Sequence, residues 1–317
     1  METNIVYQED CIEGMKKIPS NSIDLVLTDP PYGITACEWD KPVDLEKFWV
    51  EIKRIIKPNG AIVMTASQPF TTDLINSNRE WFKYCLCWNK GTHSNPLLAK
   101  KQPLRIHEDI IIFYKKCFYN PQMEKGKSYK KDYGYKKHST DSFGNLNLID
   151  KDNKSGLRYP KSIINIGQPK NNRKFNHPTQ KPVELFKYLI KSYSNENQIV
   201  LDCFGGSGTT AIACMETNRE YICFENNPQY FKIINDRIKS AKSQTLNPTD
   251  STLLKAEGFN ISLKDNSNEL SQISSNDETS LNNNIKRNFS FGSQARFNSP
   301  EALCNLQQKD LNSGGGY

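Results

Sequence analysis

The feature that most constrains this chain is a short apolar run that ends in two prolines. Residues 23–28 read Ile-Asp-Leu-Val-Leu-Thr, and Asp29-Pro30-Pro31-Tyr32 follows directly. The run is apolar enough for a strand buried in a parallel sheet, and it must end at the prolines because they cannot donate to a sheet ladder. Asp29 and Tyr32 are therefore expected at the carboxyl end of a strand, where open α/β sheets hold their ligands. Taken alone, the tetrapeptide is also compatible with a rigid turn that has no functional role.

Buried strands alternate with amphipathic helices along most of the chain, which predicts an α/β domain with a largely parallel sheet. The strand-like runs lie at 4–7, 23–27, 61–66, 84–88, 109–114, 197–203 and 219–225. The helical runs lie at 10–17, 45–56, 69–77, 183–190, 209–215 and 228–240. Lys57-Pro58-Asn59-Gly60 is expected to stop a helix, and residues 91–107 are expected to form a loop.

A second ligand-binding pattern follows the strand at 197–203. The sequence Asp-Cys-Phe-Gly-Gly-Ser-Gly-Thr-Thr at 202–210 opens a helix, and Glu225 ends the next strand. Glycines let the backbone approach a ligand, the helix N-terminus favours a carboxylate, and an acid at this distance can bind both ribose hydroxyls. The turn lacks the spacing of triphosphate and dinucleotide motifs. A sulfonium nucleoside, with one carboxylate, one ribose and no phosphate, fits better.

Basic residues are concentrated in the middle of the chain. The formal net charge is +7, and many lysines between residues 90 and 137 interleave with Tyr119, Tyr129, Tyr133 and Tyr135. Lysine neutralises phosphates and tyrosine stacks on bases, so this composition is typical of a nucleic-acid surface. A solvated, lysine-rich loop has the same composition.

The cysteines and the apolar runs indicate the setting in which the protein works. The chain has nine scattered cysteines, which suggest reduced thiols in a cytoplasmic protein. No leader or bilayer-spanning run is found, so no membrane is expected. Cys85 and Cys87 lack a second pair at zinc spacing, so no metal site is expected. His107-Glu108 is assigned a packing role in the loop.

Three motifs in a fixed order resemble those of the β-class amino methyltransferases of DNA. They are Asp-Pro-Pro-Tyr at 29–32, His-Pro-Thr-Gln-Lys-Pro at 177–182 and Phe-Gly-Gly-Ser-Gly-Thr-Thr at 204–210. The resemblance covers about residues 4–240. It implies a Rossmann-like fold dependent on S-adenosylmethionine, with a mostly parallel twisted sheet and helices on both faces. It implies catalysis by residues 1–114 and 177–240 and an inserted target recognition region at 115–176. The tail at 241–317 lies outside the resemblance, and its Asn- and Ser-rich composition predicts that it is disordered.

The resemblance also implies the reaction, which is site-specific transfer of a methyl group to the N6 amine of adenine. The base is flipped out of the duplex, and the methyl group passes in line. Asp29 and the Pro30 carbonyl accept hydrogen bonds from the amine, the rigid Pro30-Pro31 pair fixes that carbonyl, and Tyr32 stacks on the base. The alternatives are an N4-cytosine enzyme and an inactive DNA-binding partner with this fold. A third possibility is methylation of RNA or of a protein side-chain amide, but relatives with Asn-Pro-Pro-Tyr that methylate such amides place the cofactor motif first, the reverse of this chain.

The implied cofactor-binding residues come from four parts of the chain: Asp10, Thr179, Gln180, Lys181, Asp202, Phe204, Gly205, Gly208 and Glu225. Asp10 and Thr179 also suit helix starts, which is their simpler interpretation. Double-stranded DNA is the implied partner, and the protein would associate with the nucleoid through it. The resemblance allows a homodimer and a cognate restriction endonuclease, neither of which the residues specify.

Overall fold

The computed structural model describes residues 1–35, 37, 40–130, 137–140, 144–147, 153–168 and 180–246. These residues belong to one compact unit, which spans Met1–Asp250. The expected tail lies outside the described residues from position 247 onward. Within the described part of the chain, no helix is both long and apolar enough to span a membrane.

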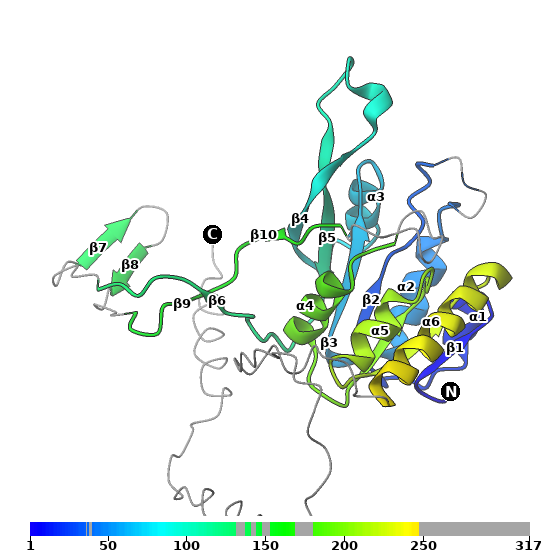
Figure 1. The fold of residues 1–317 in the computed structure, drawn as a ribbon. Helices are drawn as coiled ribbons and strands as arrows, with labels where there is room; N and C mark the ends of the chain where they lie inside the picture. Colours follow the sequence, from blue (N-terminus) through cyan, green and yellow to red (C-terminus); the bar gives the residue numbers. More distant parts are fainter. Residues whose placement is uncertain are drawn as a thin grey trace, which may run out of the picture. The chain divides into compact units, whose positions relative to one another are not determined.

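The unit is built on an eight-stranded sheet (Figure 1). The strands lie in the order β1 (Ile5–Tyr7), β12 (Glu220–Phe224), β11 (Ile199–Asp202), β2 (Ile23–Thr28), β3 (Ile56–Ala66), β5 (Arg105–Phe113), β4 (Phe82–Ser94) and β10 (Ile163–Asn165). Only β5 runs antiparallel to its neighbours in this sheet. The expected mostly parallel α/β sheet is therefore confirmed.

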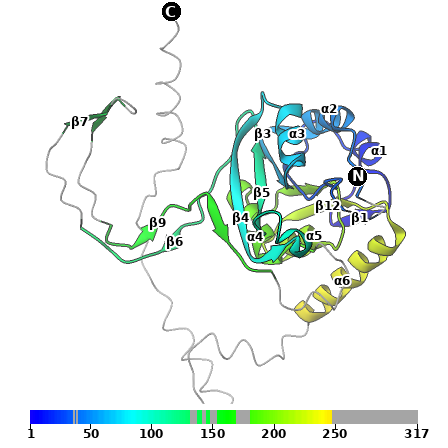
Figure 2. The ribbon, with the colours of Figure 1, turned by 90° about the horizontal axis from the view of Figure 1, so that it is seen from above.

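Helices cover both faces of the sheet (Figure 2), because successive strand residues alternate between two apolar cores. In β5, for example, Ile110 and Ile112 belong to one core, and Ile111 and Phe113 belong to the other. The first core also receives buried residues of α4 (Val183–Tyr193), α5 (Thr209–Met215) and α6 (Pro228–Leu246). The second receives those of α1 (Cys11–Lys16), α2 (Leu45–Ile55) and α3 (Phe70–Ser77).

The helix α2 ends at Ile55, just before residues 57–60, as expected, but these residues already belong to the next strand. Strand β3 begins at Ile56, directly after α2, and continues through these residues. The register passes from Ile23 opposite Ile56 to Leu25 opposite Ala61, so β3 itself bulges here against β2. Pro58 lies inside this irregularity, where its missing N–H removes no regular ladder bond.

The expected loop at 91–107 is also shorter than the sequence suggested. β4 extends to Ser94 and β5 begins at Arg105, so the two strands form a long antiparallel hairpin. Its tip contains the 3-10 helix η1 (Pro96–Leu98). Polar residues at the ends of both strands hid this extension, because their pattern is not apolar.

The region expected to be the recognition insert contains short strands. β6 (Glu124–Lys125) pairs with β9 (Leu157–Arg158), and β7 (Lys137–Thr140) pairs with β8 (Gly144–Asn147). The Arg158 guanidinium lies 4.7 Å from the centroid of the Tyr129 ring. β10 returns to the main sheet and pairs with β4. Strands of two to four residues are too short to give a recognisable period, so the sequence did not indicate them.

Candidate functional site

The two motif strands are neighbours in the sheet. Val200 pairs with Leu25 and Leu201 with Val26, in parallel. Asp202 and Asp29 therefore emerge at the same edge. They open on one cavity of about 930 Å³, whose walls also include the other implied site residues Asp10, Pro30, Pro31, Tyr32, Gln180, Lys181, Phe204, Gly205 and Glu225. Gly208 is not among the residues that line the cavity, and Thr179 lies outside the described residues.

Asp202 is a buried acceptor that ties three segments together. Its Oδ1 accepts the Thr28 hydroxyl at 2.7 Å and the Phe204 N–H at 3.1 Å, and its Oδ2 accepts the Thr210 hydroxyl. Burial raises the pKa of Asp202 to about 6, although these hydrogen bonds favour the charged form. The carboxylate therefore fixes the start of the glycine turn against the end of β2.

The raised pKa predicts a pH-dependent stability. The folded pKa of about 6 exceeds the ordinary 3.8, so the stabilisation from protonating Asp202 is complete below about pH 4 and is lost as pH rises through 6. This gap corresponds to about 3 kcal/mol in the free energy of unfolding. Asp202→Asn should therefore gain stability relative to the wild type between pH 4 and pH 7, measured by urea denaturation. Exposed Asp73→Asn serves as the control, and a constant difference across this range would contradict the assignment.

Glu225 supports the glycine turn from the neighbouring strand. Its Oε2 accepts the Gly206 N–H and its Oε1 the Asn227 N–H, both at 2.8 Å. Burial raises the pKa of Glu225, and these two N–H groups partly oppose that shift. Each carboxylate oxygen has a further acceptor site toward the cavity, as binding of a pair of ribose hydroxyls requires.

Gly208 supports the turn without facing the cavity. Its φ is +76°, and a Cβ on it would lie 2.8 Å from Cγ2 of Ile234 in α6. The glycine is thus required by backbone conformation and by helix packing. Asp10 caps α1, where its Oδ1 accepts the N–H groups of Ile12 at 2.9 Å and Glu13 at 3.2 Å.

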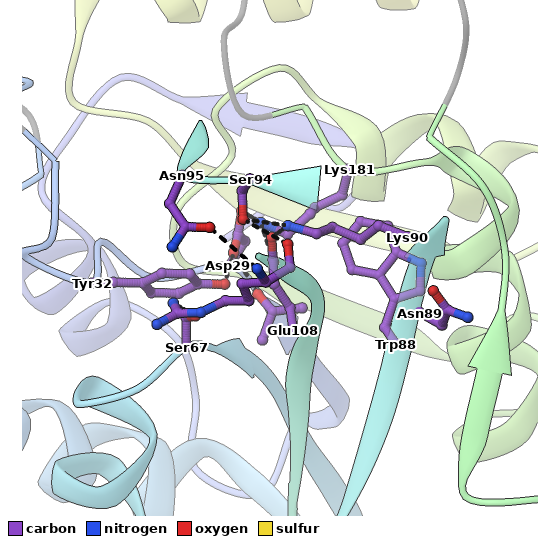
Figure 3. Close-up of polar contacts among 12 residues, drawn as sticks. Asp29, Tyr32, Ser67, Trp88, Asn89, Lys90, Ser94, Asn95, Glu108 and Lys181 are labelled. Atoms are coloured by element: carbon purple, nitrogen blue, oxygen red, sulfur yellow. Dashed lines mark hydrogen bonds and ion pairs between the residues drawn. The ribbon is translucent and has the colours of Figure 1, made fainter. Parts of the chain in front are cut away.

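The second half of the cavity is the part lined by Asp29 and by the polar side chains around it, which Figure 3 draws. Its Oδ1 accepts hydrogen bonds from the Tyr32 hydroxyl at 2.7 Å and from the Thr65 hydroxyl, and its Oδ2 accepts Lys181 Nζ at 2.7 Å. The Tyr32 ring stacks on Phe70, with 5.6 Å between centroids. Burial and the nearby negative charges of Asp29 and Glu108 raise the pKa of Tyr32, so its hydroxyl remains a donor.

Two further charged residues complete this half, and the sequence had not indicated them. Glu108 Oε1 lies 3.1 Å from Lys90 Nζ, and Glu108 Oε2 lies 3.2 Å from Lys181 Nζ. Glu108 is in β5, which begins four residues before the strand expected at 109–114. A strand period does reveal it, because Glu108 has the same parity as Ile110 and Ile112, which face the core that contains α4.

Asp40 was also not expected at the site. Its carboxylate accepts the backbone N–H groups of Gly33, Ile34 and Thr35 at 2.8, 3.0 and 2.7 Å. Burial acts to raise the pKa of Asp40, but these bonds and one from the Thr35 side chain leave it below its ordinary value. The carboxylate thus fixes the turn that directly follows Tyr32.

The fold and the cavity define an α/β protein with a nucleoside-type crevice beside a carboxylate site. The model of the DNA methylase family matches residues 23–236, which is more than half of the chain, so the protein belongs to that family. It is 30% identical to the type II methyltransferase M.HinfI of Haemophilus influenzae, over 80% of this chain and 72% of that one. It is 29% identical to the DNA adenine methyltransferase YhdJ of Escherichia coli, over 73% and 81%.

Solved structures show the same fold. The cytosine-N4-specific PvuII DNA methyltransferase gives a TM-score of 0.53 at 17% identity, over 78% of this chain and 94% of that one. The M1.HpyAVI–SAM complex gives 0.51 at 23% identity, over 74% and 98%. Family and fold together confirm the expected class, an S-adenosylmethionine-dependent DNA methyltransferase.

Proposed function

We propose that this protein methylates the N6 amine of adenine at a specific sequence in duplex DNA. The observation that carries the proposal is the single cavity that Asp29 and the glycine turn share at the ends of β2 and β11. A methyl donor on the turn and an amine on Asp29 would then meet inside one cavity. The relative YhdJ, named a DNA adenine methyltransferase, supports adenine as the target.

The cavity wall fits S-adenosylmethionine. Gln180 is only 8% exposed, and its buried Oε1 has no hydrogen-bond partner among the residues that the structure describes, so it can accept a donor such as the ammonium group of a methionine moiety. Glu225 would hold the ribose, and Phe204 and Gly205 would line the nucleoside. The cofactor supplies an electrophilic methyl group on its sulfonium.

The residues after β2 would prepare the amine to attack the methyl group. The lone pair of an exocyclic amine is delocalised into the base, so the nitrogen becomes nucleophilic only when its hydrogens are drawn toward fixed acceptors. Asp29 and the Pro30 carbonyl would be these acceptors, and the two prolines keep the second one rigid. Tyr32, with its ring packed on Phe70, would stack on a base extruded from the duplex. Lysines of residues 115–176 would contact DNA phosphates.

Transfer of tritiated methyl groups from S-adenosylmethionine to unmethylated plasmid DNA, followed by nucleoside analysis, tests the proposal. Label in N6-methyladenine is the expected result. Label in N4-methylcytosine would instead make the protein a cytosine enzyme, like the PvuII methyltransferase whose fold it shares. DNA binding without any label would identify an inactive partner protein.

A further inference from the structure

Lys181 lies between the carboxylates of Asp29 and Glu108, and the Glu108 carboxylate has an oxygen that could accept a further hydrogen bond from it. The ammonium nitrogen is 2.7 Å from Asp29 Oδ2 and 3.2 Å from Glu108 Oε2. The second contact is close enough for an ion pair, but Oε2 is buried and, within the described part of the chain, has no partner in hydrogen-bond geometry. A small rotation of the lysine side chain could therefore give Glu108 a full hydrogen bond.

In this arrangement, Lys181 competes with the substrate for Asp29. A carboxylate oxygen has two acceptor sites, and those of Asp29 Oδ1 are taken by the hydroxyls of Tyr32 and Thr65. The target amine must therefore use Oδ2, where Lys181 occupies one of the two acceptor sites, so that the amine and the ammonium would share one oxygen. During transfer, positive charge moves from the sulfonium to the amine nitrogen. An ammonium held on Asp29 opposes that charge, and burial strengthens the effect because Lys181 is only 6% exposed.

Glu108 is held in place to receive the ammonium. Lys90 is 7% exposed, and its Nζ lies 3.1 Å from Glu108 Oε1, which leaves Oε2 facing Lys181. The cluster of two lysines and two carboxylates has no net charge. If Lys181 shifts to Glu108 while the amine binds Asp29, each of the two acids keeps a charged or hydrogen-bonding partner.

We propose that Glu108 is a positioning residue that takes Lys181 from Asp29 when the target amine binds. The proposal rests on the proposed role of Asp29 as the amine acceptor. In the absence of a base, Lys181 pairs with Asp29. When the base enters, its amine binds Oδ2 and Lys181 pairs with Glu108 instead of Asp29.

The first test is Glu108→Gln, which keeps the shape of the side chain and removes its charge. We expect kcat at saturating S-adenosylmethionine to fall by about 10- to 100-fold, because Lys181 stays on Asp29. Cofactor affinity, measured by calorimetry, should change only a few-fold. Glu184→Gln, the same change at an exposed ion pair of α4, is the matched control and should retain wild-type kcat. Wild-type kcat in Glu108→Gln would overturn the inference.

A second-site variant separates positioning from a merely structural role. Adding Lys181→Met to Glu108→Gln removes the competing ammonium, so part of the lost kcat should return. A double variant as impaired as Glu108→Gln would overturn the inference. If Glu108→Gln melts early, Glu108→Asp keeps the charge and should retain more activity than Gln. A wild-type protein that labels no DNA would instead overturn the proposed function, and the inference with it.

Discussion

Replacing Asp29 by alanine will lower methyl transfer by about 10³-fold or more, while cofactor affinity stays within a few-fold of the wild type. Asp29 is the proposed acceptor for the target amine, and its loss removes interactions that strengthen in the transition state. Its side chain contacts Tyr32, Thr65 and Lys181 and none of the glycine turn, so the cofactor half of the cavity should survive. Single-turnover labelling of plasmid DNA and calorimetry with S-adenosylmethionine measure the two quantities.

Asp73→Ala is the control for this experiment. Asp73 is an exposed aspartate in the first turn of α3, so its loss should leave transfer unchanged. Asp29→Asn adds a finer comparison, because the amide keeps one acceptor oxygen and loses the charge that pairs with Lys181. We expect its activity to lie between those of the wild type and alanine. Full activity in Asp29→Ala would show that the amine is held elsewhere.

The second large effect is expected at Glu225. Glu225→Ala should raise the Kd for S-adenosylmethionine by at least about 100-fold, equivalent to about 2.7 kcal/mol. The substitution removes the proposed ribose acceptor and also leaves the Gly206 and Asn227 N–H groups without their carboxylate. Calorimetric titration measures the change, and transfer at saturating cofactor should recover most of the wild-type rate.

Glu225→Gln and Glu216→Gln complete this series. The glutamine at 225 retains one acceptor oxygen, so its Kd should lie between those of the wild type and alanine. Glu216 is half-exposed, pairs with Lys187 and is not among the residues that line the cavity. Its substitution should therefore leave the Kd unchanged. An unaltered Kd in Glu225→Ala would remove Glu225 from the cofactor site.

Local patterns were enough to predict the sheet edge that carries the site. Asp29, Asp202 and Glu225 each follow a short apolar run, and a parallel sheet brings the ends of such runs together. The structure does place all three around one cavity. Gly208 illustrates the limit of this reasoning, since its need for glycine comes from Ile234 of a later helix.

The charged cluster around Lys181 could not be predicted in the same way. Glu108 and Lys90 lie in strand extensions where polar residues break the apolar pattern, and only the antiparallel pairing of β4 with β5 brings them together. Lys181 joins them from a segment more than 70 residues later. Such contacts depend on strand register and on long-range packing, which a single sequence does not specify.

The neighbour relation of β2 and β11 has a consequence for how the protein is made. β2 leaves the ribosome about 170 residues before the strand that completes its central pairing, and the separation between β1 and its partner β12 is longer still. Contacts this distant in sequence slow folding. The amine-binding half of the cavity is therefore translated well before the half that holds the methyl donor, and a chain arrested before residue 199 has no cofactor crevice.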